Sequence, residues 1–268
     1  MGFEYLEVDG GRIAFEDTVG NGPLVVLMPP MGALRSVYRF VTPKLVDAGY
    51  RVVTLDLRGH GQSSTGWTDY SIAAHGRDVL ALVRRIDSGP AFLVGNSFTG
   101  GVAVWAAAED PDLTRGIVLI GSFVRTVHIN LVMRLIMKLT FAGPWGPAAW
   151  MSYYPRMYPG PKPDDFAEHL AATSEMMKEP GRFESFRRIA AASKRDSESR
   201  LALVKVQALV VMGSADPDFP DALAEAEFQA KALNAKKVII EGSGHHPQAD
   251  SPDRTATALI EFFDLHSG

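Results

Sequence analysis

The sequence contains no cysteine, and this absence removes several kinds of chemistry at once. Without a thiol there is no cysteine nucleophile and no thiolate ligand for a zinc site. The histidine, aspartate and glutamate residues show no metal-ligand spacing either, so we expect no metal ion and no cofactor. The lack of cysteine suits a reducing compartment, and we expect the protein to be cytoplasmic.

The chain also lacks an excess of positive charge and a long apolar run. Its formal net charge is -4, so nothing indicates nucleic acid as a partner. Residues 1–7 contain no basic segment, and no signal peptide is expected. A length of 268 residues with 46% hydrophobic content suits one α/β domain with a substantial core. Contact with a membrane is not expected, and a homodimer is compatible with the sequence.

Short apolar runs alternate with helical patterns along most of the chain. The first two runs form a polar-apolar hairpin joined at Gly10-Gly11. We expect strands at 4–8, 12–16, 24–28, 51–57, 91–94, 117–120, 208–212 and 237–240, and helices at 36–48, 72–86, 102–109 and 253–263. This alternation predicts an α/β fold with a mostly parallel eight-stranded sheet flanked by helices. Ligands bind such sheets at the carboxyl ends of the strands.

Residues 95–100, Gly-Asn-Ser-Phe-Thr-Gly, place a serine between the expected strand 91–94 and a helical run that starts at Val102. A strand that turns sharply into a helix through its serine leaves that hydroxyl on a strained, exposed corner. The start of the helix supplies free N–H groups and a partial positive charge, which both suit an anion. Ser97 is therefore a candidate nucleophile, although serine and glycine are also common in ordinary turns.

An acid and a base follow Ser97 at the ends of two later strands. Asp216 comes after the run 208–212, and His245 comes after the run 237–240. Parallel strands bring both side chains to the same edge of the sheet as Ser97. Asp218 and His246 are the alternatives for the acid and the base.

Three segments resemble motifs of the α/β-hydrolase fold superfamily, and the resemblance covers nearly the whole chain. Residues 56–63, Asp-Leu-Arg-Gly-His-Gly-Gln-Ser, resemble the loop after that family's fourth strand. Residues 213–220 resemble its G-x-x-D-x-x-x-P acid loop, which assigns the acid to Asp216. Residues 244–252 resemble its closing G-H-x-x-x-x-[DE]-x-P segment, which assigns the base to His245.

The resemblance implies a serine esterase-like enzyme with a helical cap. Its triad would be Ser97 as nucleophile, His245 as general base and Asp216 as the acid that orients the imidazole. We expect hydrolysis of a small hydrophobic ester through an acyl-enzyme. Hydrolysis of a carbon–carbon or an amide bond by the same triad is an alternative. A ligand-binding or receptor protein on a hydrolase scaffold is another, because fold alone does not decide function.

The sequence departs from the family pattern at two places. Thr99 stands where the serine turn usually has glycine, and Pro29-Pro30 stands where the family usually has His-Gly. Proline has no backbone N–H, so the first residue after the pair that can donate to an oxyanion is Met31. The residue after the nucleophile supplies the second donor in such sites. We therefore predict an oxyanion hole made by the backbone amides of Met31 and Phe98.

The alternation of strands and helices stops between residues 122 and 201. We expect residues 123–201 to form a helical cap inserted after the sixth strand, with 1–122 and 202–268 forming the core domain. Residues 114–163 contain no Asp or Glu and include the apolar run 129–139, which is too short to cross a bilayer. The favoured interpretation is a cap that lines an apolar pocket. A lid that touches a membrane surface and a cationic entrance for an anionic substrate are alternatives.

Methionine and aromatic side chains are frequent in the expected cap. Such side chains fill irregular apolar cavities, although they also serve as ordinary packing. The candidate substrate-binding residues are Met133, Met137, Trp145, Trp150, Tyr154 and, after the base, His246. As a set they favour a hydrophobic substrate over a sugar or a peptide.

Overall fold

The computed structural model describes residues 2–126, 135 and 139–267 of the chain. Eight strands form one sheet in the order β1-β2-β4-β3-β5-β6-β7-β8. β1 and β2 form an antiparallel hairpin, β2 pairs antiparallel with β4, and all other neighbours are parallel. The fold class predicted from the sequence is therefore confirmed. The strands are β1 (Glu4–Val8), β2 (Gly11–Asp17), β3 (Leu24–Met28), β4 (Arg51–Leu55), β5 (Ala91–Asn96), β6 (Thr114–Ile120), β7 (Gln207–Gly213) and β8 (Lys236–Ile240).

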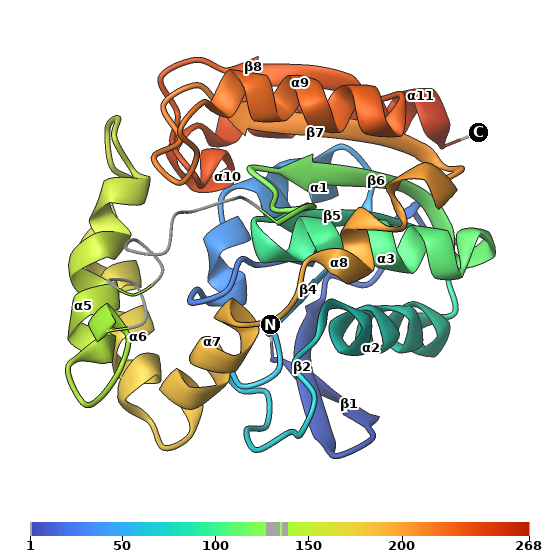
Figure 1. Cartoon of the computed structure of the whole chain (residues 1–268). Coiled ribbons are helices and arrows are strands. Elements are labelled where there is room, and N and C mark those ends of the chain that lie inside the picture. Colours follow the sequence, from blue (N-terminus) through green and yellow to red (C-terminus); the bar gives the residue numbers. More distant parts are fainter. Residues whose placement is uncertain (1, 127–134, 136–138, 268) are drawn as a thin grey trace.

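Helices cover both faces of this sheet, which explains why the central strands are mostly apolar. α2, α3 and α9 pack on one face, and α1 and α11 pack on the other. Figure 1 shows this arrangement, with both helical layers beside the parallel strands. The elements outside the insertion are η1 (Arg35–Tyr38), α1 (Val41–Asp47), α2 (Ile72–Ile86), α3 (Phe98–Glu109), η2 (Pro111–Leu113), α9 (Ala222–Leu233), α10 (Pro247–Asp250) and α11 (Pro252–His266).

Most strand and helix boundaries differ from the predicted ones by a few residues, and two helices differ in a way that affects the site. The helix expected over 36–48 is divided into the 3-10 helix η1 and the helix α1, because Arg39 N–H bonds to Ser36 O in a tight 3-10 turn. The helix after Ser97 begins at Phe98 and not at Val102. The serine therefore lies directly before the first residue of α3, whereas residues 98–101 were expected to separate it from the helix.

A helical segment is inserted between β6 and β7. It contains α5 (Gly146–Tyr153), η3 (Tyr154–Met157), α6 (Phe166–Lys178), α7 (Arg182–Ala190), α8 (Arg195–Glu198) and η4 (Leu201–Leu203). In Figure 1, α5, α6 and α7 lie together at one end of the molecule, apart from α2 and α9. No helix in the described part of the chain has the length and apolar character needed to cross a membrane.

Candidate active site

Ser97 occupies a strained turn between β5 and α3. Its backbone has φ 60° and ψ -120°, a conformation that a residue with a side chain rarely adopts and that costs about 1–3 kcal/mol. The turn is held from both sides, because Ser97 N–H donates to Ile120 O at 2.9 Å and Phe123 N–H donates to Ser97 O at 3.1 Å. Among the described residues, none forms a hydrogen bond with Ser97 Oγ. The serine hydroxyl is thus presented on a rigid corner without an internal partner.

Thr99 fits the turn where glycine was expected because its hydroxyl is bonded twice. Thr99 Oγ1 lies 2.9 Å from Met28 O and 2.8 Å from Asn96 O, so it joins the end of β3 to the serine turn. The close approach that requires glycine falls one residue later. A Cβ on Gly100 would lie 1.9 Å from Ser122 Oγ. The departure from the family pattern is therefore accommodated by a shift of one position.

Asp216 and His245 meet at the same edge of the sheet, after β7 and β8. Asp216 Oδ2 lies 2.7 Å from His245 Nδ1, and both side chains are almost completely buried. Gly121, which follows β6, leaves room for this pair, because a Cβ there would lie 3.0 Å from Asp216 Oδ2. An imidazole held in this way carries its proton on Nδ1 and offers Nε2 for proton transfer.

The surroundings of His245 favour its charged form. Burial by itself lowers the pKa of His245, but the negative charges of Asp216 and Asp218 outweigh burial and raise the pKa to about 9. Asp218 Oδ2 lies 3.4 Å from His245 Nε2, the ring nitrogen that Asp216 does not bind. The sequence offered Asp218 only as an alternative acid. In the structure it lies beside the other ring nitrogen.

The backbone amides of Met31 and Phe98 have no hydrogen-bond acceptor in the described part of the chain. Phe98 N–H is free because Phe98 is the first residue of α3, and the first amides of a helix have no partner within it. The loop that carries Met31 is fixed by the next residue, since Gly32 N–H donates to His60 Nε2 at 2.9 Å. His60 Nδ1 lies 3.1 Å from Arg58 O, so the ring is neutral and bonded at both nitrogens. Burial lowers the pKa of His60 to about 4.

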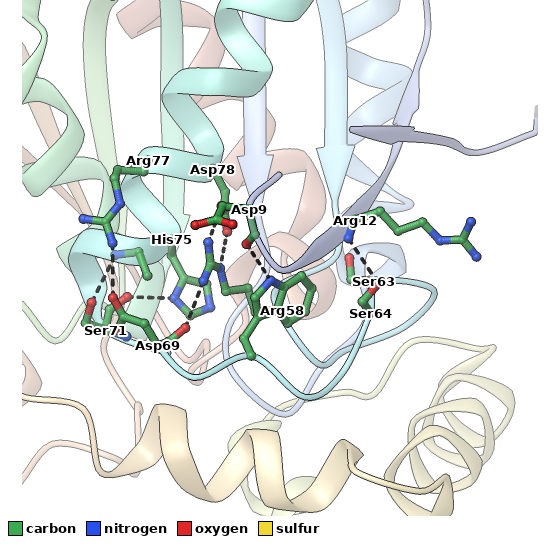
Figure 2. A network of polar contacts seen from close by, with 12 residues as sticks. Asp9, Arg12, Arg58, Ser63, Ser64, Asp69, Ser71, His75, Arg77 and Asp78 are labelled. Carbon is green, nitrogen blue, oxygen red and sulfur yellow. Dashed lines mark hydrogen bonds and ion pairs between the residues drawn. The ribbon is translucent and has the colours of Figure 1, made fainter. Parts of the chain in front are cut away.

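The loop over residues 56–63 is a buried polar framework. Arg58 binds Asp78 of α2 through two contacts, of 2.6 Å and 2.7 Å, and also donates to Asp69 O at 3.0 Å. Figure 2 shows Arg58 between these groups and shows Asp69 beside Ser71. At the start of the loop, Asp56 accepts from Arg35 N–H at 3.0 Å. The family-like motif at 56–63 therefore anchors α2 and the segment after β3 that carries Met31.

Asn96 forms a second buried network, which the sequence did not reveal. Its Nδ2 donates to Ile120 O at 2.8 Å and to His245 O at 3.0 Å. Its Oδ1 lies 2.9 Å from His246 Nδ1 and 2.8 Å from Gln248 Nε2. The residue before the serine thus fixes the backbone of His245. The available signal was a polar residue within an apolar strand, directly before Ser97.

The candidate substrate-binding residues occupy different environments. Met133 and Met137 lie outside the described residues. Trp145 is 56% exposed and donates to Leu139 O, while Trp150 is buried and donates to Gly32 O at 3.2 Å. Tyr154 is fully buried, and its hydroxyl lies 3.1 Å from His169 Nε2. His246 is buried against the rings of Tyr154 and Tyr158.

Asp216, Asp218 and His245 also form a cluster whose ligand atoms lie within 4.8 Å of one another, which is close enough to surround a cation. The spacing of these residues in the sequence gave no indication of such a group. The cluster consists of the acid–base pair and its neighbouring carboxylate. We therefore interpret it through proton transfer and assign no metal ion to it.

Comparisons with known proteins agree with this architecture. A 2-(acetamidomethylene)succinate hydrolase of Mesorhizobium japonicum is 34% identical over 114 residues, 42% of this chain and 41% of that protein. An uncharacterized protein of Mycobacterium tuberculosis is 33% identical over 132 residues, 49% of this chain and 38% of that protein. The matches to these relatives thus span about two fifths of their lengths. The structure of a thermophilic esterase from Thermogutta terrifontis superimposes with a TM-score of 0.78 at 23% identity, covering 100% of both chains.

Residues 25–258 match the sequence model of the group described as "Alpha/beta hydrolase family". The match covers most of the chain and includes the serine turn, the acid loop and the histidine loop. The resemblance drawn from the motifs is therefore confirmed: the chain belongs to the alpha/beta hydrolase family.

Proposed function

We propose that the protein is a serine hydrolase that cleaves a small hydrophobic ester through an acyl-enzyme. One observation carries this proposal. The strained Ser97, with φ 60°, lies at the same sheet edge as the buried Asp216–His245 pair, whose atoms are 2.7 Å apart. Strain of this kind is retained where the surrounding structure enforces it, and it is concentrated at functional sites.

The proposed reaction has two halves. His245 Nε2 takes the proton of Ser97 Oγ as Oγ attacks the ester carbonyl carbon, and Asp216 stabilises the imidazolium. The oxyanion accepts hydrogen bonds from the Met31 and Phe98 amides, each worth about 3–4 kcal/mol in the transition state. When the tetrahedral intermediate collapses, the carbon–oxygen bond to the alcohol breaks and Nε2 returns the proton to it. Water then repeats the sequence on the acyl-enzyme and frees Ser97.

The walls near His245 support an apolar substrate. The rings of Phe123 and Phe219 stack with centroids 4.6 Å apart, and they lie 6.0 Å and 6.3 Å from the His245 ring. An apolar wall excludes water and suits a hydrophobic acyl or alcohol group.

We further propose that residues 123–201 act as a cap over a core made of 1–122 and 202–268. Two contacts support this division. Trp150 Nε1 donates to Gly32 O at 3.2 Å, and Met157 O accepts from His245 N–H at 3.0 Å. The inserted segment therefore touches both the loop of the proposed oxyanion donor and the loop of the proposed base.

A fluorophosphonate probe tests the proposal directly. We expect one phosphonate per chain, located on Ser97 by mass spectrometry, and much slower labelling of the His245→Ala variant. Ser214→Ala is the matched control, because Ser214 lies at the same sheet edge but its hydroxyl is bonded to Glu241. It should label like the wild-type protein. A folded wild-type sample that takes up no label would overturn the enzyme proposal and favour a ligand-binding role.

A further inference from the structure

His245 lies between two carboxylates, and the proposed mechanism uses only one of them. Asp216 binds Nδ1, whereas Asp218 Oδ2 lies 3.4 Å from Nε2. The two acids are fixed relative to each other, since Asp218 N–H donates to Asp216 Oδ1 at 2.9 Å. The acid loop therefore places one carboxylate near each ring nitrogen of His245.

The second carboxylate is held by the inserted helical segment. Tyr153 of α5 donates its hydroxyl hydrogen to Asp218 Oδ1. Burial and the nearby charge of Asp218 raise the pKa of Tyr153, so the phenol stays protonated and remains a donor. The ring of Tyr153 also packs against Trp150, with centroids 6.0 Å apart. The Tyr153–Asp218 pair thus connects α5 to the nitrogen that would perform proton transfer.

This contact opposes the proposed chemistry. Nε2 must be free and unprotonated to take the proton of Ser97, yet a carboxylate at 3.4 Å favours the imidazolium and occupies that edge of the ring. Within the described part of the chain, no hydrogen bond joins Ser97 Oγ to His245. The arrangement holds the base in a resting state.

Other ionisable groups near His245 do not supply this effect. His246 is buried and neutral, because burial and the positive charge of His245 hold its pKa well below its usual value. Asp250 binds Ser243 and Gly244 N–H and does not contact the ring of His245. From the inserted segment, Tyr153 faces the pair, and Arg156 acts on the charge of Tyr153 only weakly. Besides Asp216, Asp218 is therefore the group whose removal should change the pKa of His245.

We propose that Asp218, held by Tyr153, is a positioning residue whose carboxylate occupies Nε2 of His245. A bound substrate would separate the Tyr153–Asp218 pair from the ring and free this nitrogen. The inference rests on the proposed role of His245 as the base. It assigns to the inserted segment a function beyond enclosing the substrate, because movement of α5 would release Nε2 for Ser97.

The pH dependence of Ser97 labelling by a fluorophosphonate tests this proposal in the full-length protein. With both neighbouring carboxylates present, labelling should increase with pH toward about 9, the pKa of His245. Asp218→Asn keeps an acceptor for Tyr153 but removes the charge, and should move this profile about one pH unit lower. Labelling at pH 7 should then be roughly tenfold faster. Tyr153→Phe should move the profile in the same direction by less, because the carboxylate is no longer held against the ring.

Glu241→Gln is the matched control, because it removes one exposed carboxylate near the same loops without touching His245. Its profile should coincide with that of the wild-type protein. An Asp218→Asn profile that also coincides with the wild-type profile would overturn the role of Asp218. A shift of Tyr153→Phe to higher pH would overturn the role of Tyr153.

Titration of the His245 ring by NMR separates this inference from the proposed function. The resonance is assigned by its loss in His245→Gln, and the measurement needs no turnover. A lower pKa in Asp218→Asn than in the wild-type protein supports the contact even if Ser97 never labels. Equal pKa values of His245 in the two proteins would contradict the inference even if Ser97 labels normally.

Discussion

The loop over residues 56–63 and the sheet edge that carries Ser97 both contain an acid, a histidine and a serine. In the loop, Asp56 accepts from Arg35 and His60 is bonded at both nitrogens. At the sheet edge, Ser97 Oγ and the amides of Met31 and Phe98 have no partner among the described residues. Residue types alone do not separate these two clusters. The difference lies in which polar groups are already bonded.

A buried polar group without a partner costs free energy, so a fold that leaves several together must compensate elsewhere. The hydrogen bonds of the loop over residues 56–63 supply this stabilisation, because they fix the backbone at Gly32 and Arg35. The comparison predicts that changes at the sheet edge remove activity with little loss of stability. Changes in the loop should mainly lower stability, except at His60, which bonds to the segment that carries Met31.

The largest effect is expected at Ser97. Ser97→Ala and Ser97→Gly should both lower kcat for an ester by at least about 10⁴-fold. Ser97→Gly should also be about 1 kcal/mol more stable than Ser97→Ala, because glycine tolerates the positive φ. Urea unfolding of both variants measures this difference. An alanine variant more stable than the glycine variant would show that the turn is not strained.

Arg58 tests the loop. Arg58→Met leaves Asp78 buried without its partner, and should lower the free energy of unfolding by about 3–5 kcal/mol. Arg84→Met breaks the exposed pair with Asp110 and should cost less than about 1 kcal/mol. Denaturant titration measures both. Equal losses would mean that burial of the Arg58–Asp78 pair has no special importance.

His60 lies where the two regions meet. His60→Ala removes the acceptor of Gly32 N–H, and should lower kcat about 10–100-fold with little change in KM, because Met31 loses its fixed position. His169→Ala is the control, since His169 is also buried but bonds to Tyr154. Steady-state kinetics on a p-nitrophenyl ester distinguish the two. A fall in kcat of the same size in both variants would argue against the role of His60.

Low pH should destabilise the protein through His75 of α2, which is buried and neutral. Burial lowers the pKa of His75 to about 3, below the value near 6.5 of the unfolded chain. The unfolded state therefore binds more protons between these values, and stability falls as the pH falls from about 6.5. His75→Asn should reduce the loss of stability between pH 7.5 and pH 5 by about 1–2 kcal/mol. Denaturation at the two pH values measures it, and an unchanged loss would contradict a buried neutral His75.

Much of the fold was predictable because strand periodicity and chain order are local or sequential signals. The five residues of β3 were predicted at their observed positions, and the strands before Ser97, Asp216 and His245 are parallel neighbours or near neighbours. The carboxyl ends of parallel strands lie at one edge of the sheet. Residues that directly follow such strands in the sequence can therefore be predicted to lie close together.

Contacts between distant side chains were not predictable. The bond from Asn96 to His245 O, and the approach of Asp218 to Nε2, depend on how loops from different strands pack. The tight turn that divides η1 from α1 carries no Pro or Gly that would mark it in the sequence. The partner of Tyr153 depends on the packing of the inserted segment, which periodicity does not determine.

The position of the insertion has a consequence for biosynthesis. β6 pairs with β5 on one side and β7 on the other, but the helical segment separates β6 from β7 along the chain. As the polypeptide leaves the ribosome, the far edge of β6 stays without its partner until the whole insertion has been made. An open apolar edge is a template for aggregation, so a chain shortened before β7 should be retained by chaperones or precipitate.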